Sequence, residues 1–208
     1  MDILHSDRTT WLLGLGGAAL GLLLLAGCAS TPGVRGASQG SDGIHVVENR
    51  PVDSAVRQDF ARALELLEAG QYPQAIDLLE KVTTRAQNHS APFVNLAKAY
   101  VMTGNYDRAE ANLDRAMQIN PGHPVTLHEL ALLYRETGRY DDSRQVYETL
   151  TARYPEFMPA RKNFGILCEL YLDDPACALK QYRSYIDNNP GEEDVKLWIL
   201  GLERRVGG

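Results

Sequence analysis

Few residues of this 208-residue chain stand in a pattern that could support catalysis or bind a metal. His128 and Glu129 begin like a zinc-binding His-Glu-x-x-His helix, but the position four residues after His128 is Leu132. No phosphate-binding Gly-rich loop with Lys occurs. Gly14-Leu15-Gly16 resembles the start of a dinucleotide-binding motif only superficially, because it lies in an apolar segment with no strand before it. The sequence therefore predicts no enzyme and no metal, cofactor or small-molecule site, and it predicts solvated side chains for His89 and His123.

The cysteines divide into Cys28, near the N-terminus, and a pair nine residues apart, Cys168 and Cys177. In an oxidising compartment the pair could form a disulfide. In the chain-entropy model a loop of this size adds about 2.5–3 kcal/mol to the free energy of unfolding. The alternative is two buried free thiols. The spacing lacks the Cys-x-x-Cys pattern of redox enzymes and so argues against a redox role.

Composition excludes one large class of partner. The formal net charge is −6 and the isoelectric point is near 5.4, with no basic stretch. Nucleic-acid binding rests on Lys and Arg side chains that neutralise phosphates. The chain is therefore not expected to bind nucleic acid.

A short element recurs three times and indicates the fold. It occurs at Gly70–Ala75, Gly104–Ala109 and Gly138–Ser143, and its glycines are 34 residues apart each time. A period of this length is typical of helix-turn-helix units that stack into a solenoid, because one helical pair cannot bury its apolar face alone.

The element and its surroundings resemble the tetratricopeptide repeat family. The clearest copy covers residues 90–123, with Ala97 and Ala109 where two helices cross, Tyr106 after the turn, and Pro121 after the second helix. Further copies are expected at 56–89, 124–157 and 158–191. The fourth copy departs at its turn, where Tyr171–Pro175 replaces the Gly-x-Tyr element and shifts the second half by one residue. A capping helix is expected at 192–205. The resemblance implies an all-α, right-handed α-solenoid of about four repeats at 54–205.

The N-terminus is expected to be a targeting segment. No charged residue occurs from Thr9 to Val34, and the apolar run ends in Leu25-Ala26-Gly27-Cys28, which resembles the lipobox of bacterial lipoproteins. The resemblance implies a signal peptide at 1–27 and acylation of Cys28. The alternative is an uncleaved membrane anchor, since about 20 apolar residues span a bilayer.

The residues after Cys28 indicate the membrane to which the protein is sorted and the nature of the segment that joins the lipid to the repeat domain. Ala29 and Ser30 stand where proteobacterial lipoproteins retained on the inner membrane carry Asp. The expected address is therefore the periplasmic face of the outer membrane, with the chain held to the membrane by its lipid. Residues 28–53 are rich in Gly and Ser and show no apolar periodicity, so they are expected to be a flexible tether.

The resemblance also implies a binding surface, since ligands of this family lie against the first helices of successive repeats. Asn95 and Asn163 stand at positions that often hydrogen-bond a peptide backbone in the family. The family's carboxylate-binding pattern is not reproduced, because Phe60 and Leu64 replace its Lys and Asn. The expected groove residues are Phe60, Leu64, Val94, Asn95, Lys98, Val101, His128, Leu132, Arg135, Lys162, Asn163 and Ile166.

These features predict an outer-membrane lipoprotein that binds a protein partner. The combination resembles the pilotin-like lipoproteins of type IV and Flp pilus assembly, and a secretin or another pilus component would then be the partner. One alternative is an adaptor for peptidoglycan hydrolases or outer-membrane assembly factors. Another is a structural lipoprotein that associates with itself.

Overall fold

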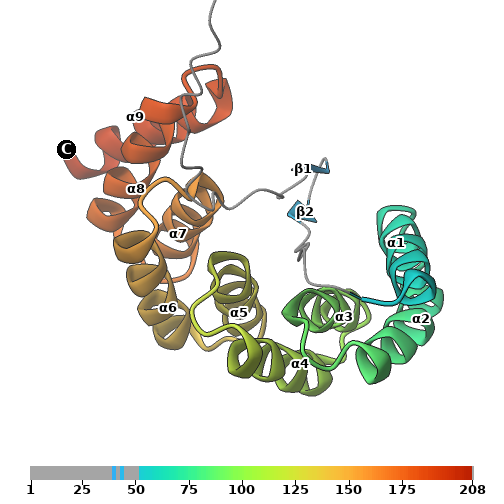
Figure 1. Cartoon of the computed structure of the whole chain (residues 1–208). Helices are drawn as coiled ribbons and strands as arrows, with labels where there is room; N and C mark the ends of the chain where they lie inside the picture. Colours follow the sequence, from blue (N-terminus) through green and yellow to red (C-terminus); the bar gives the residue numbers. More distant parts are fainter. Residues whose placement is uncertain (1–38, 41–42, 45–51, 208) are drawn as a thin grey trace, which may run out of the picture. The chain divides into compact units, whose positions relative to one another are not determined.

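The computed structural model describes residues 39–40, 43–44 and 52–207 (Figure 1). In this part of the chain, antiparallel helical pairs follow one another and a last helix closes the row. The helices are α1 (Ser54–Glu68), α2 (Tyr72–Arg85), α3 (Ser90–Met102), α4 (Tyr106–Ile119), α5 (Pro124–Glu136), α6 (Tyr140–Arg153), α7 (Met158–Leu170), α8 (Pro175–Asn188) and α9 (Glu193–Gly207). The prediction of an all-α solenoid with four helical hairpins and a final helix is confirmed.

The predicted turn element has a clear conformational role. Gly70, Gly104 and Gly138 have φ of 69°, 74° and 77° and follow the first helix of repeats one to three. This left-handed region is costly for residues with a Cβ. The amide two residues after each helix's cap then reaches back to close the last turn; Asn105 N, for example, donates to Tyr100 O at 2.8 Å. The periodic glycines therefore end the first helices and reverse the chain.

Small residues allow the helices of each hairpin to pack closely. Ala97 and Ala109, predicted at the crossing of α3 and α4, are 1% and 0% exposed. In the third repeat the equivalent small residue is Ser143, whose buried hydroxyl donates to Ala131 O at 2.7 Å. The fold thus keeps the crossing tight and still provides a partner for the one polar side chain that it buries there.

The fourth repeat contains the expected one-residue shift in its turn. Four residues separate α7 from α8, whereas three separate the two helices of each earlier repeat. Asp173 takes the left-handed conformation, with φ of 46°, in place of a glycine. Asp174 then caps α8 by accepting a hydrogen bond from Cys177 N at 2.9 Å. This bond, together with the Arg144 guanidinium 3.0 Å away, lowers the pKa of Asp174.

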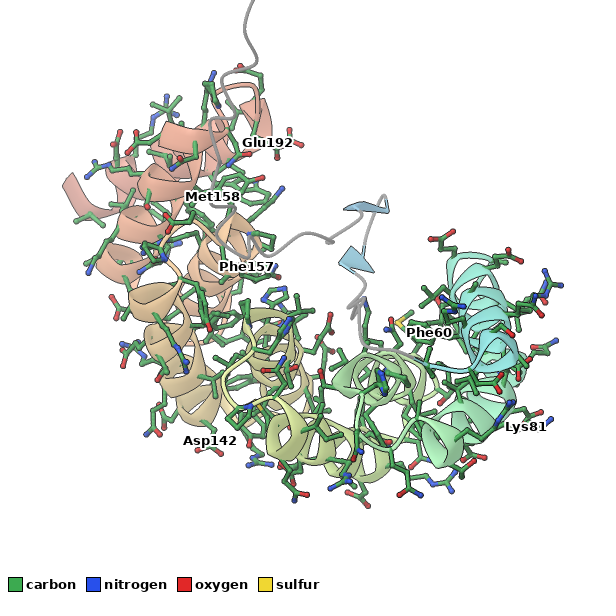
Figure 2. The ribbon with its side chains drawn as sticks, in the orientation of Figure 1. Phe60, Lys81, Asp142, Phe157, Met158 and Glu192 are labelled. Carbon is green, nitrogen blue, oxygen red and sulfur yellow. A yellow bond between two sulfur atoms is a disulfide. The ribbon has the colours of Figure 1, made fainter. Side chains whose placement is uncertain are left out.

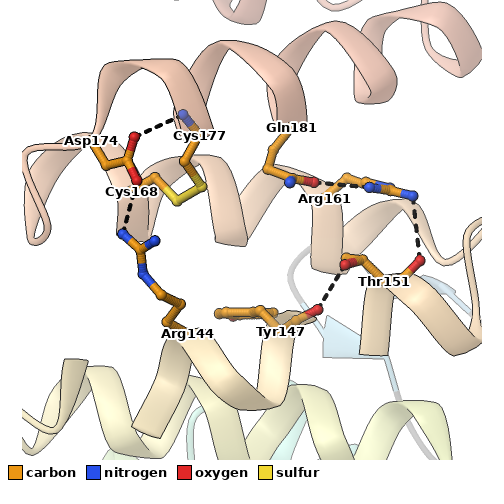
Figure 3. The surroundings of a disulfide bond; sticks show 8 residues. All are labelled: Arg144, Tyr147, Thr151, Arg161, Cys168, Asp174, Cys177 and Gln181. Atoms are coloured by element: carbon orange, nitrogen blue, oxygen red, sulfur yellow. Dashed lines mark hydrogen bonds and ion pairs between the residues drawn. A yellow bond between two sulfur atoms is a disulfide. The ribbon is translucent and has the colours of Figure 1, made fainter. Parts of the chain in front are cut away.

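A disulfide joins Cys168 on α7 to Cys177 on α8, beside this altered turn (Figure 3). Cys168 is fully buried, and Cys177 is partly exposed. The pair thus links the two helices at the point where the usual glycine turn is missing.

Opening this bond is expected to destabilise the repeat domain. The double variant Cys168→Ala/Cys177→Ala should lose about 2–3 kcal/mol of unfolding free energy, because a short closed loop is released in the unfolded chain. Denaturant unfolding of the variant and of the wild type, each with and without a reductant, measures the effect. Reductant should lower the stability of the wild type by a similar amount and leave the variant unchanged. An equal response of both proteins to reductant would contradict the prediction.

A three-residue cluster connects the first repeat to the second. Tyr100 donates its hydroxyl to Glu80, and an Arg108 nitrogen lies 3.4 Å from the same carboxylate. The Arg108 guanidinium also lies 4.9 Å from the centre of the Tyr100 ring, within cation–π range. Burial and the hydrogen bond to Glu80 raise the pKa of Tyr100 to about 12, so the phenol stays a donor.

A second cluster of the same chemistry connects the second repeat to the third. Arg139 lies 2.7 Å from a Glu110 oxygen, and its guanidinium is 3.9 Å from the centre of the Tyr134 ring. We call these two groups, Glu80/Tyr100/Arg108 and Glu110/Tyr134/Arg139, the inter-repeat clamps. Each clamp ties the second helix of one repeat to the hairpin that follows.

The expected signal peptide at 1–27, Cys28 and most of the tether at 28–53 lie outside the described residues. Within the tether, β1 (Gln39–Gly40) and β2 (Gly43–Ile44) pair antiparallel, with Gln39 opposite Ile44 and Gly40 opposite Gly43. The sequence predicted no secondary structure here. Two residues separate the strands, which is the commonest hairpin spacing, and this explains the short ladder. Among the described helices, none has the length and apolar character needed to cross a membrane.

Candidate protein-binding groove

The first helices of the repeats form the inner side of a curved row. Successive first helices contact one another, α1 with α3, α3 with α5, and α5 with α7. Figure 1 shows these helices on the inner side of the curve, with α2, α4, α6 and α8 outside them. Figure 2 shows Phe60 on the inner side and Lys81 and Asp142 on the outer side. Residues at equivalent positions of the first helices therefore lie next to one another and form one continuous surface.

Nine of the twelve predicted groove residues keep part of their side chain accessible. They include apolar and polar side chains and are distributed over the four first helices. These residues are Phe60, Leu64, Lys98, Val101, Leu132, Arg135, Lys162, Asn163 and Ile166. We call this set the groove.

The other three predicted groove residues, Val94, Asn95 and His128, are buried. Val94 belongs to the hydrophobic core of the first three repeats. Asn95 is 0% exposed and donates its amide to Ala91 O at 2.9 Å, one turn earlier on its own helix. Asn163, the partly exposed counterpart, makes the same bond to Pro159 O at 3.0 Å. The prediction that Asn95 lines the accessible groove is therefore wrong.

His128 packs between helices and does not face the groove. Its ring lies 5.9 Å from the Tyr147 ring and 5.6 Å from the Phe157 ring, measured between centroids. Burial disfavours the charged imidazole, and the Lys98 and Arg135 charges add to this effect, so the pKa of His128 falls to about 3. The side chain is thus a neutral part of the core, and its assignment to the groove was wrong for this reason.

The basic groove residues lie beside carboxylates. Lys98 lies 3.4 Å from Glu129 of the next repeat, and both side chains are less than one-fifth exposed. Lys162 lies 2.9 Å from Glu192, which precedes α9. Arg135 lies 2.9 Å from its neighbour Glu136. The groove therefore presents apolar side chains between largely neutralised ion pairs.

An apolar cavity of about 290 Å³ lies at the N-terminal end of the groove. Phe60 and Leu64 line it, so it joins the predicted surface directly. His89, predicted to be solvated, is also in its wall, and neither ring nitrogen has a hydrogen-bond partner among the described residues. The remaining lining residues are Val52, Val56, Arg57, Ala61, Val82, Ala86, Ala91 and Pro92.

The sequence did not predict this cavity. In the first repeat Asp59 stands where the second and third copies carry Phe93 and Leu127. The structure places Asp59 3.1 Å from Arg85, in an exposed ion pair, and Asp59 does not line the cavity. The cavity depends on how α1, α2 and the start of α3 pack together, which the repeat pattern alone does not give.

Among the described residues, no group of three or more His, Cys, Asp or Glu side chains is gathered in a way that could hold a metal ion. The groove geometry is suited to contact with a polypeptide segment, because it offers apolar anchors along an extended row of helices.

Comparison with known proteins connects this architecture to a family. A family model described as tetratricopeptide repeat matches residues 66–115 and 104–163. Among sequence relatives, the TPR repeat-containing protein YvcD of Bacillus subtilis is 29% identical over 126 residues, covering 61% of this chain and 26% of that protein. This chain spans between 7% and 42% of the length of the curated relatives compared with it.

Solved structures share the fold at low sequence identity. The Pseudomonas aeruginosa PilF structure has a TM-score of 0.67 and 20% identity, covering 74% of this chain and 69% of that one. A MamA structure from Desulfovibrio magneticus RS-1 has a TM-score of 0.64 and 16% identity, covering 76% of this chain and 88% of that one. Identities this low establish a common fold and nothing more specific.

Proposed function

We propose that this chain, whose repeats match the tetratricopeptide repeat family model at residues 66–115 and 104–163, is a scaffold for protein–protein contacts and binds a component of an envelope machine in its groove. The partner is a secretin or another pilus component, and the scaffold is held at the periplasmic face of the outer membrane by acylated Cys28. It acts by binding and not by catalysis.

The envelope assignment is supported by the Leu25-Ala26-Gly27-Cys28 sequence at the end of an apolar run. PilF shares the repeat fold at 20% identity, which makes a pilus component the first partner to test. Two or more acyl chains hold a protein stably at a membrane, which would keep the groove near envelope partners.

The groove chemistry carries the proposal for the mode of binding. Lys98 and Lys162 have carboxylate partners within 3.4 Å, so they offer little free charge to a ligand. Phe60 and Leu64 line the cavity at one end. A partner segment with hydrophobic anchors, extended or helical, fits this surface better than an acidic tail. An apolar side chain of the partner would occupy the cavity.

In-cell photo-crosslinking tests the proposal. A photoreactive residue at Val101 or Leu132 should give one discrete adduct containing a secretin or pilus protein, identified by mass spectrometry. The control position is Lys81, which lies on the outer side of the helices (Figure 2) and should give no such adduct. Leu64→Glu, which places a charge in the wall of the cavity, should reduce the adduct from Val101 at least tenfold.

Each outcome has a distinct meaning. Adducts with peptidoglycan hydrolases or outer-membrane assembly factors would overturn the pilus assignment and keep the groove. Equal adducts from Val101 and Lys81 would overturn the groove as the binding surface. Failure to label Cys28 with a fatty-acid analogue in growing cells would overturn the lipid anchor.

A further inference from the structure

The outer face of α9 carries exposed leucines where the end of a solenoid is normally polar. Leu197 is 63% exposed and Leu200 is 49% exposed, while Val195 and Leu202 on the opposite face are buried. A terminal repeat needs a polar outer surface to remain soluble, so two exposed leucines on the last helix require an explanation.

Gly201 directly follows Leu200, lies one helical turn after Leu197, and has open space around it. A Cβ added at this position would meet no atom within 4 Å. Glycine inside an exposed helix costs about 1 kcal/mol relative to alanine. Packing within the chain does not require it, but close approach of a second helix would.

The charges at the two ends of this face are opposite in sign. Asp194 lies in the first turn of α9 and Arg204 in the last. Both side chains are exposed. Among the described residues neither forms a salt bridge of 4.0 Å or less, and the charge of Asp194 acts at longer range on Lys162, whose pKa it helps to raise. Asp194, Leu197, Gly201 and Arg204 follow the three-and-four spacing that places residues along one seam of a helix.

From this pattern we propose that α9 pairs with α9 of a second copy of this chain, in an antiparallel, two-fold symmetric contact. In that arrangement Leu197 packs on Gly201 of the second copy, and Asp194 pairs with its Arg204. Both contacts occur twice, because an isologous interface repeats every contact. Leu200 lies beside the seam, where it meets its own counterpart. The proposal concerns a different surface from the groove and does not depend on the groove's partner.

Sedimentation of the full chain in detergent, over a range of protein concentrations, tests the pairing. The wild type should change reversibly from monomer to dimer. Leu197→Asp should weaken the association at least tenfold, because one substitution introduces two charges into the symmetric contact. The matched control is Leu170→Asp on α7, at a leucine with similar exposure (67%), which should leave the association unchanged.

A charge exchange tests the antiparallel arrangement itself. Asp194→Lys and Arg204→Glu should each weaken the dimer, because each places like charges opposite one another. The double variant Asp194→Lys/Arg204→Glu should restore it. Thermal unfolding of each variant shows whether the fold is kept.

Three results would overturn the proposal. These are a wild type that remains monomeric at all concentrations, a Leu197→Asp variant that associates like the wild type, and a double charge exchange that fails to restore an association lost in both single variants. None of these results alters the crosslinking expected from Val101, so failure of the dimer is distinguishable from failure of the proposed function.

Discussion

Replacing Gly165 by Ala is expected to lower the free energy of unfolding by about 2–3 kcal/mol, as overpacking of a dense core does. Gly165 is buried on α7, and a Cβ there would overlap the ring of Tyr182 on α8. That ring has little freedom to move, since Tyr182 is 1% exposed, donates to Glu169 at 3.0 Å and packs against Trp198. Denaturant unfolding followed by circular dichroism gives the change.

A second glycine in a helix supplies the control for this measurement. Gly201→Ala adds the same methyl group where nothing lies within 4 Å. In dilute protein it should raise the free energy of unfolding by about 0.5–1 kcal/mol, the ordinary helix preference for alanine. If Gly165→Ala lowers the free energy of unfolding and Gly201→Ala raises it, packing against Tyr182 decides the first result. A neutral or stabilising Gly165→Ala would contradict it.

Acid is expected to destabilise the protein through His128. The unfolded imidazole titrates near pH 6.5, whereas burial lowers the pKa in the folded state to about 3. Between these values the unfolded chain binds a proton that the folded chain does not, so stability is complete above pH 6.5 and falls as the pH decreases. The loss approaches about 1.4 kcal/mol per pH unit and is about 2 kcal/mol at pH 5.

The variant His128→Gln isolates this effect, because glutamine does not titrate. The free energies of unfolding of both proteins are measured at pH 7.5 and pH 5. The wild type should lose about 2 kcal/mol more than the variant over this range. If the free energies of unfolding of the two proteins depend on pH in the same way, His128 binds a proton equally well in the folded and the unfolded chain. This result would contradict the buried environment described here.

The helical architecture was predictable because it depends on local, repeated signals. Gly70, Gly104 and Gly138 recur with the period of the hairpin, and each has the positive φ that explains its position. The departure at the fourth turn was also visible, since Asp173 occupies the place of a glycine. Features of this kind follow from backbone conformation and need no knowledge of the neighbouring repeats.

The surface was harder to predict, because accessibility depends on how neighbouring helices are rotated. His128 and Leu132 are four residues apart, one helical turn on the same helix, yet one is buried against Tyr147 and the other lies in the groove. Helical periodicity assigns both to a similar face. Only the packing of α5 against α6 and the chain near Phe157 separates them.

The inter-repeat clamps give the order of the repeats a physical basis. The two clamps use the same residue types, but Arg108 and Arg139 do not stand at equivalent positions of their repeats. If residues 90–123 were deleted, the residue equivalent to Arg108 would be Asp142, and the carboxylate of Glu80 would then face another carboxylate. The units are alike in shape but not interchangeable. Loss of this repeat during evolution would thus place like charges at the new junction, so the charged residues at the junctions favour the present order of the first three repeats.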